Sequence, residues 1–201
     1  MENDNPTQLE RPLGQSEPTS EISREGILEI SAGLRHLLAD AFAFYIKIKN
    51  FHWHMTERHF HDYHLLLDEQ ADQLFAMTDE IAERARKIGG TTLRSVGDIS
   101  RYQRLTDNEK EILTPRGMMT EIYTDNRKLT GFLRSTHETC EKHNEIATAS
   151  LIENWVDEAE RRSWFLTWFR REALSVIIAE GFMRKAGQEE RIAGPFESRL
   201  P

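Results

Sequence analysis

The sequence predicts an all-α protein, a four-helix bundle whose second and third helices are joined by a long crossover connection. Four long segments carry apolar residues at steps of three or four, the spacing of one face of an α-helix. No segment shows the sustained alternation of apolar and polar residues that is typical of a strand. The chain has 201 residues, enough for one domain with a sizeable core.

The first two helices follow a polar N-terminal segment. Residues 1–22 hold three of the six prolines and little apolar content, so we expect a flexible tail. A first helix of about seven turns is predicted from apolar positions that share one face: Ile27, Ile30, Leu34, Leu37, Ala41, Tyr45 and Ile48. A second helix is predicted over 57–88, because apolar residues recur by sevens and Gly89-Gly90 is a typical helix end: Leu67, Leu74, Ile81 and Ile88.

A polar connection separates these helices from the next two. Residues 91–115 contain Pro115 and few apolar residues, which predicts a crossover with one short helix around Ile99 to Leu105. A third helix is predicted over about 116–140 and a fourth over about 146–180. The bundle then spans residues 23–181, and residues 182–201 form a C-terminal tail. Two helices, a long crossover and two further helices make the ferritin-like connectivity.

Charge and composition narrow the classes of function. The formal net charge of −8 disfavours tight binding to nucleic acid and suits the attraction of cations. The longest apolar run, Ala41 to Ile46, is far shorter than the roughly 20 residues that span a membrane. The single cysteine, Cys140, excludes a disulfide within the chain and fits a reducing compartment. Since no basic-then-apolar segment opens the chain, we expect a cytoplasmic protein without a membrane partner.

Five histidine and carboxylate side chains form the candidate metal site. On the second predicted helix, His64 and Asp68 are i,i+4 neighbours, as are Asp79 and Glu83. Asp68 and Asp79 are separated by about three turns, so all four side chains project from nearly one face. His52 lies at the end of the preceding helix. Nitrogen and oxygen donors of this kind suit Fe(II), Mn(II) or Zn(II).

The spacing of these ligands raises a geometric problem. His64 and Asp79 lie about 22 Å apart along a helix, too far to bind one ion. A two-fold-related copy would bring Asp79 and Glu83 of one chain opposite the two histidines and Asp68 of the other, giving two equivalent sites. The alternative is a di-iron site inside one bundle, which uses Glu-x-x-His pairs. No histidine here has Glu three residues before it, which disfavours this alternative.

Three motifs carry a resemblance to a known family. The first comprises Asn50-Phe51-His52-Trp53, Phe60, His64 and Leu67-Asp68-Glu69. The second comprises Asp79-Glu80-Ile81-Ala82-Glu83-Arg84 and Ile88-Gly89-Gly90, and the third runs from Asp157-Glu158-Ala159-Glu160 to Trp164-Phe165-Leu166. Over roughly residues 25–178 the chain resembles the Dps family, the mini-ferritins named as DNA-binding proteins from starved cells.

The resemblance implies an iron storage and detoxification protein active in oxidative stress. The family forms hollow cages of twelve subunits that oxidise Fe(II), preferentially with hydrogen peroxide, store the ferric mineral and protect DNA from oxidative damage. Its ferroxidase ligands, which span a two-fold interface, carry over to five positions here: His52, His64, Asp68, Asp79 and Glu83. Trp53 matches a tryptophan beside the iron and is the candidate electron donor. Zn(II) and Mn(II) are competing ions for the same ligands.

Some features depart from the family. Glu57 stands where Gly is usual, Thr92 where Pro or Ala is common, and Ser150 where an acidic residue often lies near an iron-entry pore. The family binds DNA through a lysine-rich tail, whereas the N-terminal tail here has no lysine. We therefore expect weak or absent DNA binding.

Two other functions stay open at this point. One is a non-enzymatic cage that binds the nucleoid, and the other is a buffer that holds Zn(II) or Mn(II) without turnover. A second group of histidines, His54, His59 and His61, is expected to form a polar surface, with assistance to metal entry or binding of a second cation as the alternative.

Overall fold

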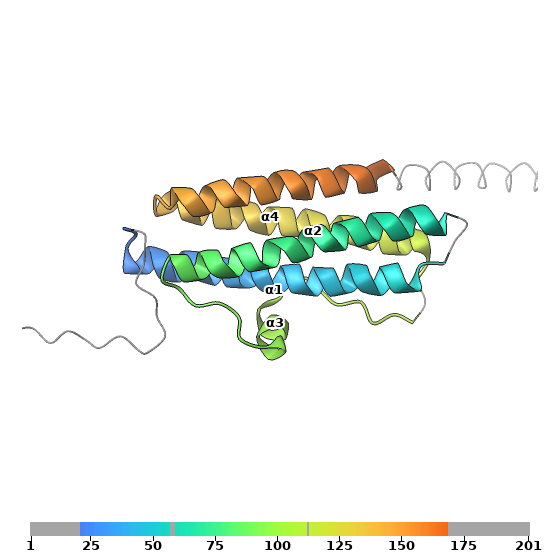
Figure 1. The fold of residues 1–201 in the computed structure, drawn as a ribbon, viewed down its shortest axis with the longest axis horizontal. Coiled ribbons are helices and arrows are strands. Elements are labelled where there is room, and N and C mark those ends of the chain that lie inside the picture. Colours follow the sequence, from blue (N-terminus) through green and yellow to red (C-terminus); the bar gives the residue numbers. More distant parts are fainter. Residues whose placement is uncertain (1–20, 57–58, 112, 169–201) are drawn as a thin grey trace, which may run out of the picture.

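The computed structural model describes residues 21–56, 59–111 and 113–168. Within them lie α1 (Arg24–His54), α2 (Phe60–Lys87), the short α3 (Val96–Tyr102), α4 (Pro115–Lys142) and a further helix over residues 146–168. No strand occurs in these residues. Figure 1 shows the four long helices side by side, with the 146–168 helix in orange and α3 against the far side of α1. The predicted all-α bundle with a crossover between α2 and α4 is confirmed.

Local sequence explains where the long helices begin and end. The Ser23 hydroxyl accepts a hydrogen bond from the Gly26 amide at the start of α1, and Thr114 accepts one from Gly117 before α4. Beyond α2, Gly89 has a φ of 87°, a left-handed conformation that glycine adopts without strain. These caps place the observed helix ends within a few residues of the predicted ones.

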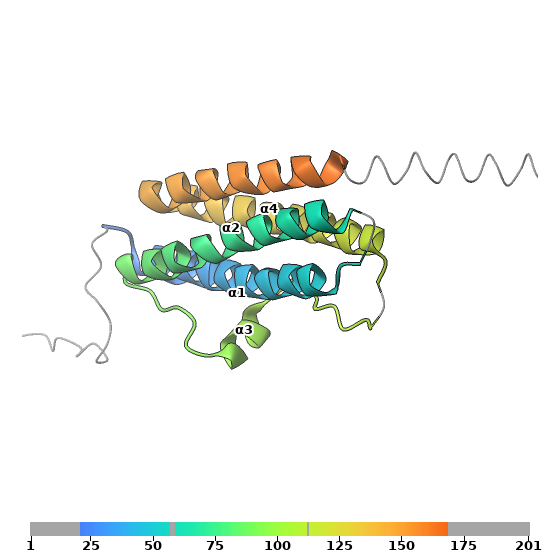
Figure 2. The same ribbon diagram turned by 45° about the vertical axis from the view of Figure 1, so that its right-hand side comes forward.

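The short helix of the crossover begins three residues earlier than predicted. It spans Val96–Tyr102 rather than Ile99 to Leu105, because the Ser95 hydroxyl accepts a hydrogen bond from the Asp98 amide and starts the helix there. Gln103 is already extended and ends it. The turned view in Figure 2 also places α3 beside α1, outside the bundle.

Parts of the predicted domain division lie outside the described residues. These parts are residues 1–20 of the N-terminal tail, residues 169–181 at the end of the bundle, and the C-terminal tail over 182–201. Among the residues that are described, no helix is both long and apolar enough to cross a membrane.

The apolar faces of the four long helices form one core. α1 and α2 contribute Leu34, Phe44, Leu67 and Leu74, each without exposed surface. From the other pair of helices, Ile122, Leu129, Leu133, Ile152 and Leu166 are equally buried. Burial of this apolar surface is the main stabilising contribution to the fold.

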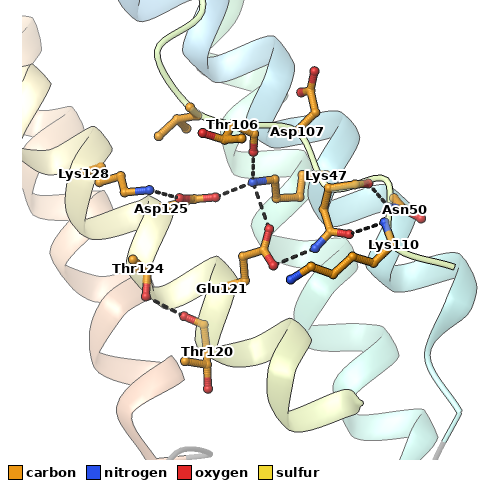
Figure 3. A network of polar contacts seen from close by, with 12 residues as sticks. Lys47, Asn50, Thr106, Asp107, Lys110, Thr120, Glu121, Thr124, Asp125 and Lys128 are labelled. Atoms are coloured by element: carbon orange, nitrogen blue, oxygen red, sulfur yellow. Dashed lines mark hydrogen bonds and ion pairs between the residues drawn. The ribbon is translucent and has the colours of Figure 1, made fainter. Parts of the chain in front are cut away.

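A buried polar network ties the crossover and α4 to α1. Figure 3 shows Lys47 of α1 between Thr106, Glu121 and Asp125. Its ammonium donates to the Thr106 carbonyl, lies 2.5 Å from Asp125 Oδ2, and pairs with Glu121 at 3.2 Å. A buried charge is tolerated only when it is paired and hydrogen-bonded, and Lys47 meets both conditions.

A second polar contact fixes the crossover beside α1. Asp40 is fully buried and accepts hydrogen bonds from the backbone amides of Arg104 and Leu105. The Arg104 guanidinium adds two further bonds to Asp40 Oδ2, at 2.8 and 2.6 Å. The same guanidinium lies 3.8 Å from the centroid of the Phe132 ring of α4.

Cys140, in the last turns of α4, is a free and fully buried cysteine. Burial raises the pKa of its thiol to about 12. Thiolate chemistry needs a lowered pKa and solvent access, so Cys140 packs as a small apolar residue.

Candidate metal centre

His52 and His64 form a stacked pair where α1 ends and α2 begins. The centroids of their rings lie 3.5 Å apart with 24° between the planes. His52 Nδ1 lies 3.0 Å from the His64 carbonyl, and His64 Nδ1 lies 3.1 Å from the His52 carbonyl. The two residues therefore hold each other in place through reciprocal contacts between ring and backbone.

These contacts fix which ring nitrogen is available to a metal. A carbonyl oxygen only accepts hydrogen bonds, so Nδ1 carries the proton in both rings. In the neutral rings Nε2 then keeps its lone pair, which is the form that ligates a metal ion. A backbone carbonyl on the other ring nitrogen is also the usual support of a metal-binding histidine.

Asp68 adds a carboxylate one turn after His64. Its Oδ1 lies 3.9 Å from His52 Nε2. A hydrogen bond from the Lys49 ammonium holds the pKa of Asp68 below its usual value, and the nearby His52 and His64 act in the same direction. The cluster therefore presents two imidazole nitrogens and one ionised carboxylate.

Asp79 and Glu83 lie on α2 but away from this cluster. Asp79 is exposed and lines an open groove of about 560 Å³ with Leu38, Phe42, Phe75 and Leu93. Glu83 pairs with Lys87 at 2.8 Å, and the hydrogen bond from Lys87 lowers its pKa. His64 and Asp79 lie on one continuous helix, so its rise puts about 22 Å between them along the α2 axis.

One chain thus assembles part of the candidate ligand set. In residues 21–56, 59–111 and 113–168, no group of three or more His, Cys, Asp or Glu side chains is placed to hold a metal ion. His52 lies beside both His64 and Asp68 without forming such a group, whereas Asp79 and Glu83 lie away from them.

A buried arginine disfavours the alternative site within one chain. Arg162, on the 146–168 helix, is 1% exposed and donates from Nε to Asn126 Oδ1 of α4. Among the residues that the structure describes, its Nη1 and Nη2 have no hydrogen-bond partner. Burial lowers its pKa to about 10, so the guanidinium stays protonated at neutral pH. A cation already in the core repels a second one.

Aromatic and apolar side chains are exposed on the two helices that carry the cluster. Trp53 follows His52 but is 62% exposed, and the Phe60 ring lies 4.9 Å from that of His64. Other large apolar residues are exposed on the same two helices: Leu28, Ile46, Leu65 and Phe75. Such a surface is typical of helices that pack against another protein chain.

The second group of histidines lies on the surface near the cluster's helix ends. His54, His59 and His61 are all exposed. His54 Nδ1 lies 2.8 Å from the Asn50 carbonyl, and the His59 ring contacts Tyr63 edge-on with centroids 6.4 Å apart. This arrangement is consistent with the polar surface that the sequence predicts.

Lys49 is the residue of the cluster that sequence reasoning missed. Its ammonium lies 2.6 Å from Asp68 Oδ1, the same oxygen that faces His52. The available signal was weak: Lys49 precedes His52 by three residues and so shares its side of α1.

Comparison with known proteins gives a consistent result. A family model described as a ferritin-like domain matches residues 31–172. DNA protection during starvation protein 1 of Deinococcus radiodurans is 26% identical over 68% of this chain, but the match spans only 66% of that relative's length. The DNA protection during starvation protein of Helicobacter pylori is 25% identical over 66% of this chain and 92% of its own.

A solved structure supports the same assignment. The Dps of Thermosynechococcus elongatus aligns with a TM-score of 0.70 and 27% identity, over 72% of this chain and 92% of that one.

Proposed function

The chain belongs to the ferritin-like family, in its Dps branch, and on that premise we propose that it oxidises Fe(II) to Fe(III) and stores the product. The observation that carries the proposal is the histidine pair. Nδ1 of each ring is hydrogen-bonded to a backbone carbonyl, and an ionised Asp68 lies beside the pair. The reaction takes place between two chains, since one chain leaves Asp79 and Glu83 apart from the histidines.

A two-fold-related copy completes the site. In such a dimer each α2 lies antiparallel to its copy, so Asp79 and Glu83 of one chain meet His52, His64 and Asp68 of the other. The exposed apolar side chains of α1 and α2 support this interface, as does the groove beside Asp79. The dimer holds two equivalent sites, each with room for two ions.

The ligand set favours oxidation of the iron substrate. His52 and His64 bind Fe(II) through Nε2, Asp68 and Glu83 bind or bridge, and Asp79 binds or orients through hydrogen bonds. Carboxylate oxygen stabilises the harder Fe(III) ion over Fe(II), which lowers the reduction potential of the bound iron. Two Fe(II) ions give one electron each to hydrogen peroxide. The O–O bond of the peroxide breaks, and its two oxygens take up two protons to form two waters.

Trp53 protects the protein if hydrogen peroxide receives only one electron instead of two. Its ring is adjacent to His52 in sequence and exposed in the single chain, where a dimer partner would cover it. An indole beside the iron can give an electron to a leftover oxidising equivalent, so that no radical escapes.

Assembly into a cage of twelve subunits would enclose the ferric mineral. Removing both Fe(II) and peroxide limits hydroxyl radical formation, and this chemistry would protect DNA without contact with it.

The test is oxidation of Fe(II) by the purified protein. Anaerobic protein is loaded with Fe(II) and given stoichiometric hydrogen peroxide, and ferric absorbance is followed. We expect rapid oxidation by the parent and at least about tenfold slower oxidation by His52→Ala and His64→Ala, because each variant loses one ligand. His137→Ala, on α4 and away from the cluster, is the matched control and should behave as the parent.

Two outcomes would contradict the proposal. Parent protein that oxidises Fe(II) no faster than buffer would favour a metal buffer or a cage without catalysis. Equal rates in parent and both histidine variants would place the reaction elsewhere.

A further inference from the structure

We propose that Lys49 determines which cations enter the site. Its ammonium pairs with Asp68, and only an ion that the two histidines also bind displaces it from that carboxylate. The proposal rests on the function proposed above and adds a selectivity residue to it.

Lys49 occupies the oxygen that an incoming ion needs. Its Nζ lies 2.6 Å from Asp68 Oδ1, and His52 Nε2 lies 3.9 Å from that same oxygen. A divalent ion bound by both His52 and Asp68 would lie close to this oxygen and therefore close to the Lys49 ammonium. Repulsion between the two positive charges would favour movement of the ammonium away from Asp68 Oδ1.

The Lys49–Asp68 pair is more shielded from solvent than the ion pair in the other half of the site. The Lys49 side chain is 17% exposed and Asp68 46%, whereas Lys87 and Glu83 are each 56% exposed. Solvent-exposed ion pairs contribute little free energy and are easily exchanged. The two halves of the site therefore differ, and displacement of Lys49 is the step that opposes metal entry.

This arrangement separates cations by their affinity for imidazole. Fe(II), Co(II) and Zn(II) gain bonds to His52 and His64, which offset the loss of the Lys49–Asp68 pair. Mg(II) prefers oxygen ligands and keeps its water, so it must compete with Lys49 for Asp68 with no gain from the histidines. Lys49 thus keeps the site free of an abundant cation that cannot be oxidised.

The test measures binding of Co(II) by titration calorimetry and visible absorbance, with and without millimolar Mg(II). We expect the parent to bind Co(II) with an affinity that Mg(II) leaves unchanged. Lys49→Met, which keeps the aliphatic stem but loses the charge, should bind Co(II) about tenfold more tightly and become sensitive to Mg(II). Lys49→Arg keeps a cation and should resemble the parent in both respects.

A matched control comes from the other end of the bundle. Lys142 pairs with Glu29 at 2.8 Å, and Lys142→Met should leave Co(II) binding unchanged. Oligomer size and melting temperature are measured for every variant, and Lys49→Gln replaces Lys49→Met if the latter does not assemble.

The outcomes separate this inference from the proposed function. Native Co(II) binding with no change in affinity or Mg(II) sensitivity in Lys49→Met would overturn the role of Lys49 alone. No Co(II) binding by the parent would overturn both. Tighter binding in Lys142→Met as well would show a general effect of net charge, and would overturn the specific role of Lys49.

Discussion

Gly90, just beyond α2, lies against α1 with no space for a side chain. A Cβ at this position would lie 2.3 Å from Ser31 Cβ and 3.0 Å from the Ala85 carbonyl oxygen. The approach lets the Gly90 amide donate to Ala85 at 2.9 Å and turns the chain into the crossover.

Replacement of this glycine is therefore expected to destabilise the protein. Gly90→Ala should lower the free energy of unfolding by about 1–3 kcal/mol, because Ser31 and the backbone must shift. Thermal melting followed by circular dichroism measures the change. Gly131→Ala is the control, since no neighbouring element of the described chain lies within 4 Å of a Cβ there. It should raise stability by about 0.5–1 kcal/mol through helix propensity. An unchanged melting temperature in Gly90→Ala would refute the steric argument.

For the candidate metal site, the sequence predicts which side chains lie close together but not how they are oriented. The i,i+4 spacing of His64 and Asp68 is a local property of a helix, so it was readable from the sequence. The tautomers of the histidines and the position of Lys49 depend on how α1 crosses α2. That crossing is set by side-chain packing between helices, which has no local signature.

The crossover is attached to the helices by a few strong contacts. Asp40 receives four hydrogen bonds from Arg104 and Leu105 while fully buried, and His36 contacts the Tyr102 carbonyl through Nδ1 at 2.7 Å. These residues are more than 60 positions apart, and no sequence pattern connects them. The helix periods were therefore predictable, whereas the path of the crossover and the start of α3 at Ser95 were not.

Weakening the contact at Asp40 should release the crossover. Asp40→Asn removes the charge that holds the Arg104 guanidinium and should cost about 2 kcal/mol. Hydrogen–deuterium exchange should show faster exchange at the amides of Arg104 and Leu105, with α4 still protected. Asp98→Asn, whose partner Arg101 is largely exposed, is the control and should exchange as the parent does. Unchanged protection in Asp40→Asn would show that packing alone holds the crossover.

The contact between Arg84 of α2 and Glu145, just before the 146–168 helix, should make stability depend on pH. Burial raises the pKa of Glu145, but hydrogen bonds from Thr148 and Arg84 outweigh it and hold the pKa below its ordinary value of 4.5. Since the folded-state pKa is the lower one, the stabilisation is full above about pH 4.5 and is lost as the pH falls through the folded-state pKa. Glu145→Gln should lower the melting temperature at neutral pH and flatten its fall between about pH 5 and pH 3.

Melting temperatures across this pH range check that expectation. Glu153→Gln, at an exposed ion pair with His137, serves as the control and should keep the acid dependence of the parent. A Glu145→Gln variant as acid-sensitive as the parent would show that other carboxylates dominate.

For the whole molecule, the family implies a cage of about 280 kDa from twelve 23.5 kDa chains. At −8 per chain the cage would carry about −96 charges, which repel a phosphate backbone. We expect light scattering to give this mass and a gel-shift assay at physiological salt to show no retardation of DNA. Robust retardation would contradict the charge argument and favour the nucleoid-binding alternative.

The case for assembly combines an argument from the sequence with an observation from the structure of the single chain. The 22 Å between His64 and Asp79 follows from helix rise alone and already indicates a second copy. The structure adds the exposed apolar residues of α1 and α2, including Phe75 and Trp53, which periodicity could not separate from core residues.

Cys140 stays a thiol under the oxidising conditions that the proposed reaction needs. The thiolate is the form that attacks peroxide, and a buried group whose pKa is raised to about 12 is almost wholly protonated at neutral pH. The only thiol of the chain should therefore resist stepwise oxidation to sulfenic, sulfinic and sulfonic acid during repeated turnover. For the same reason, a cysteine introduced on the outer surface would be the one position that a maleimide dye labels in the native protein.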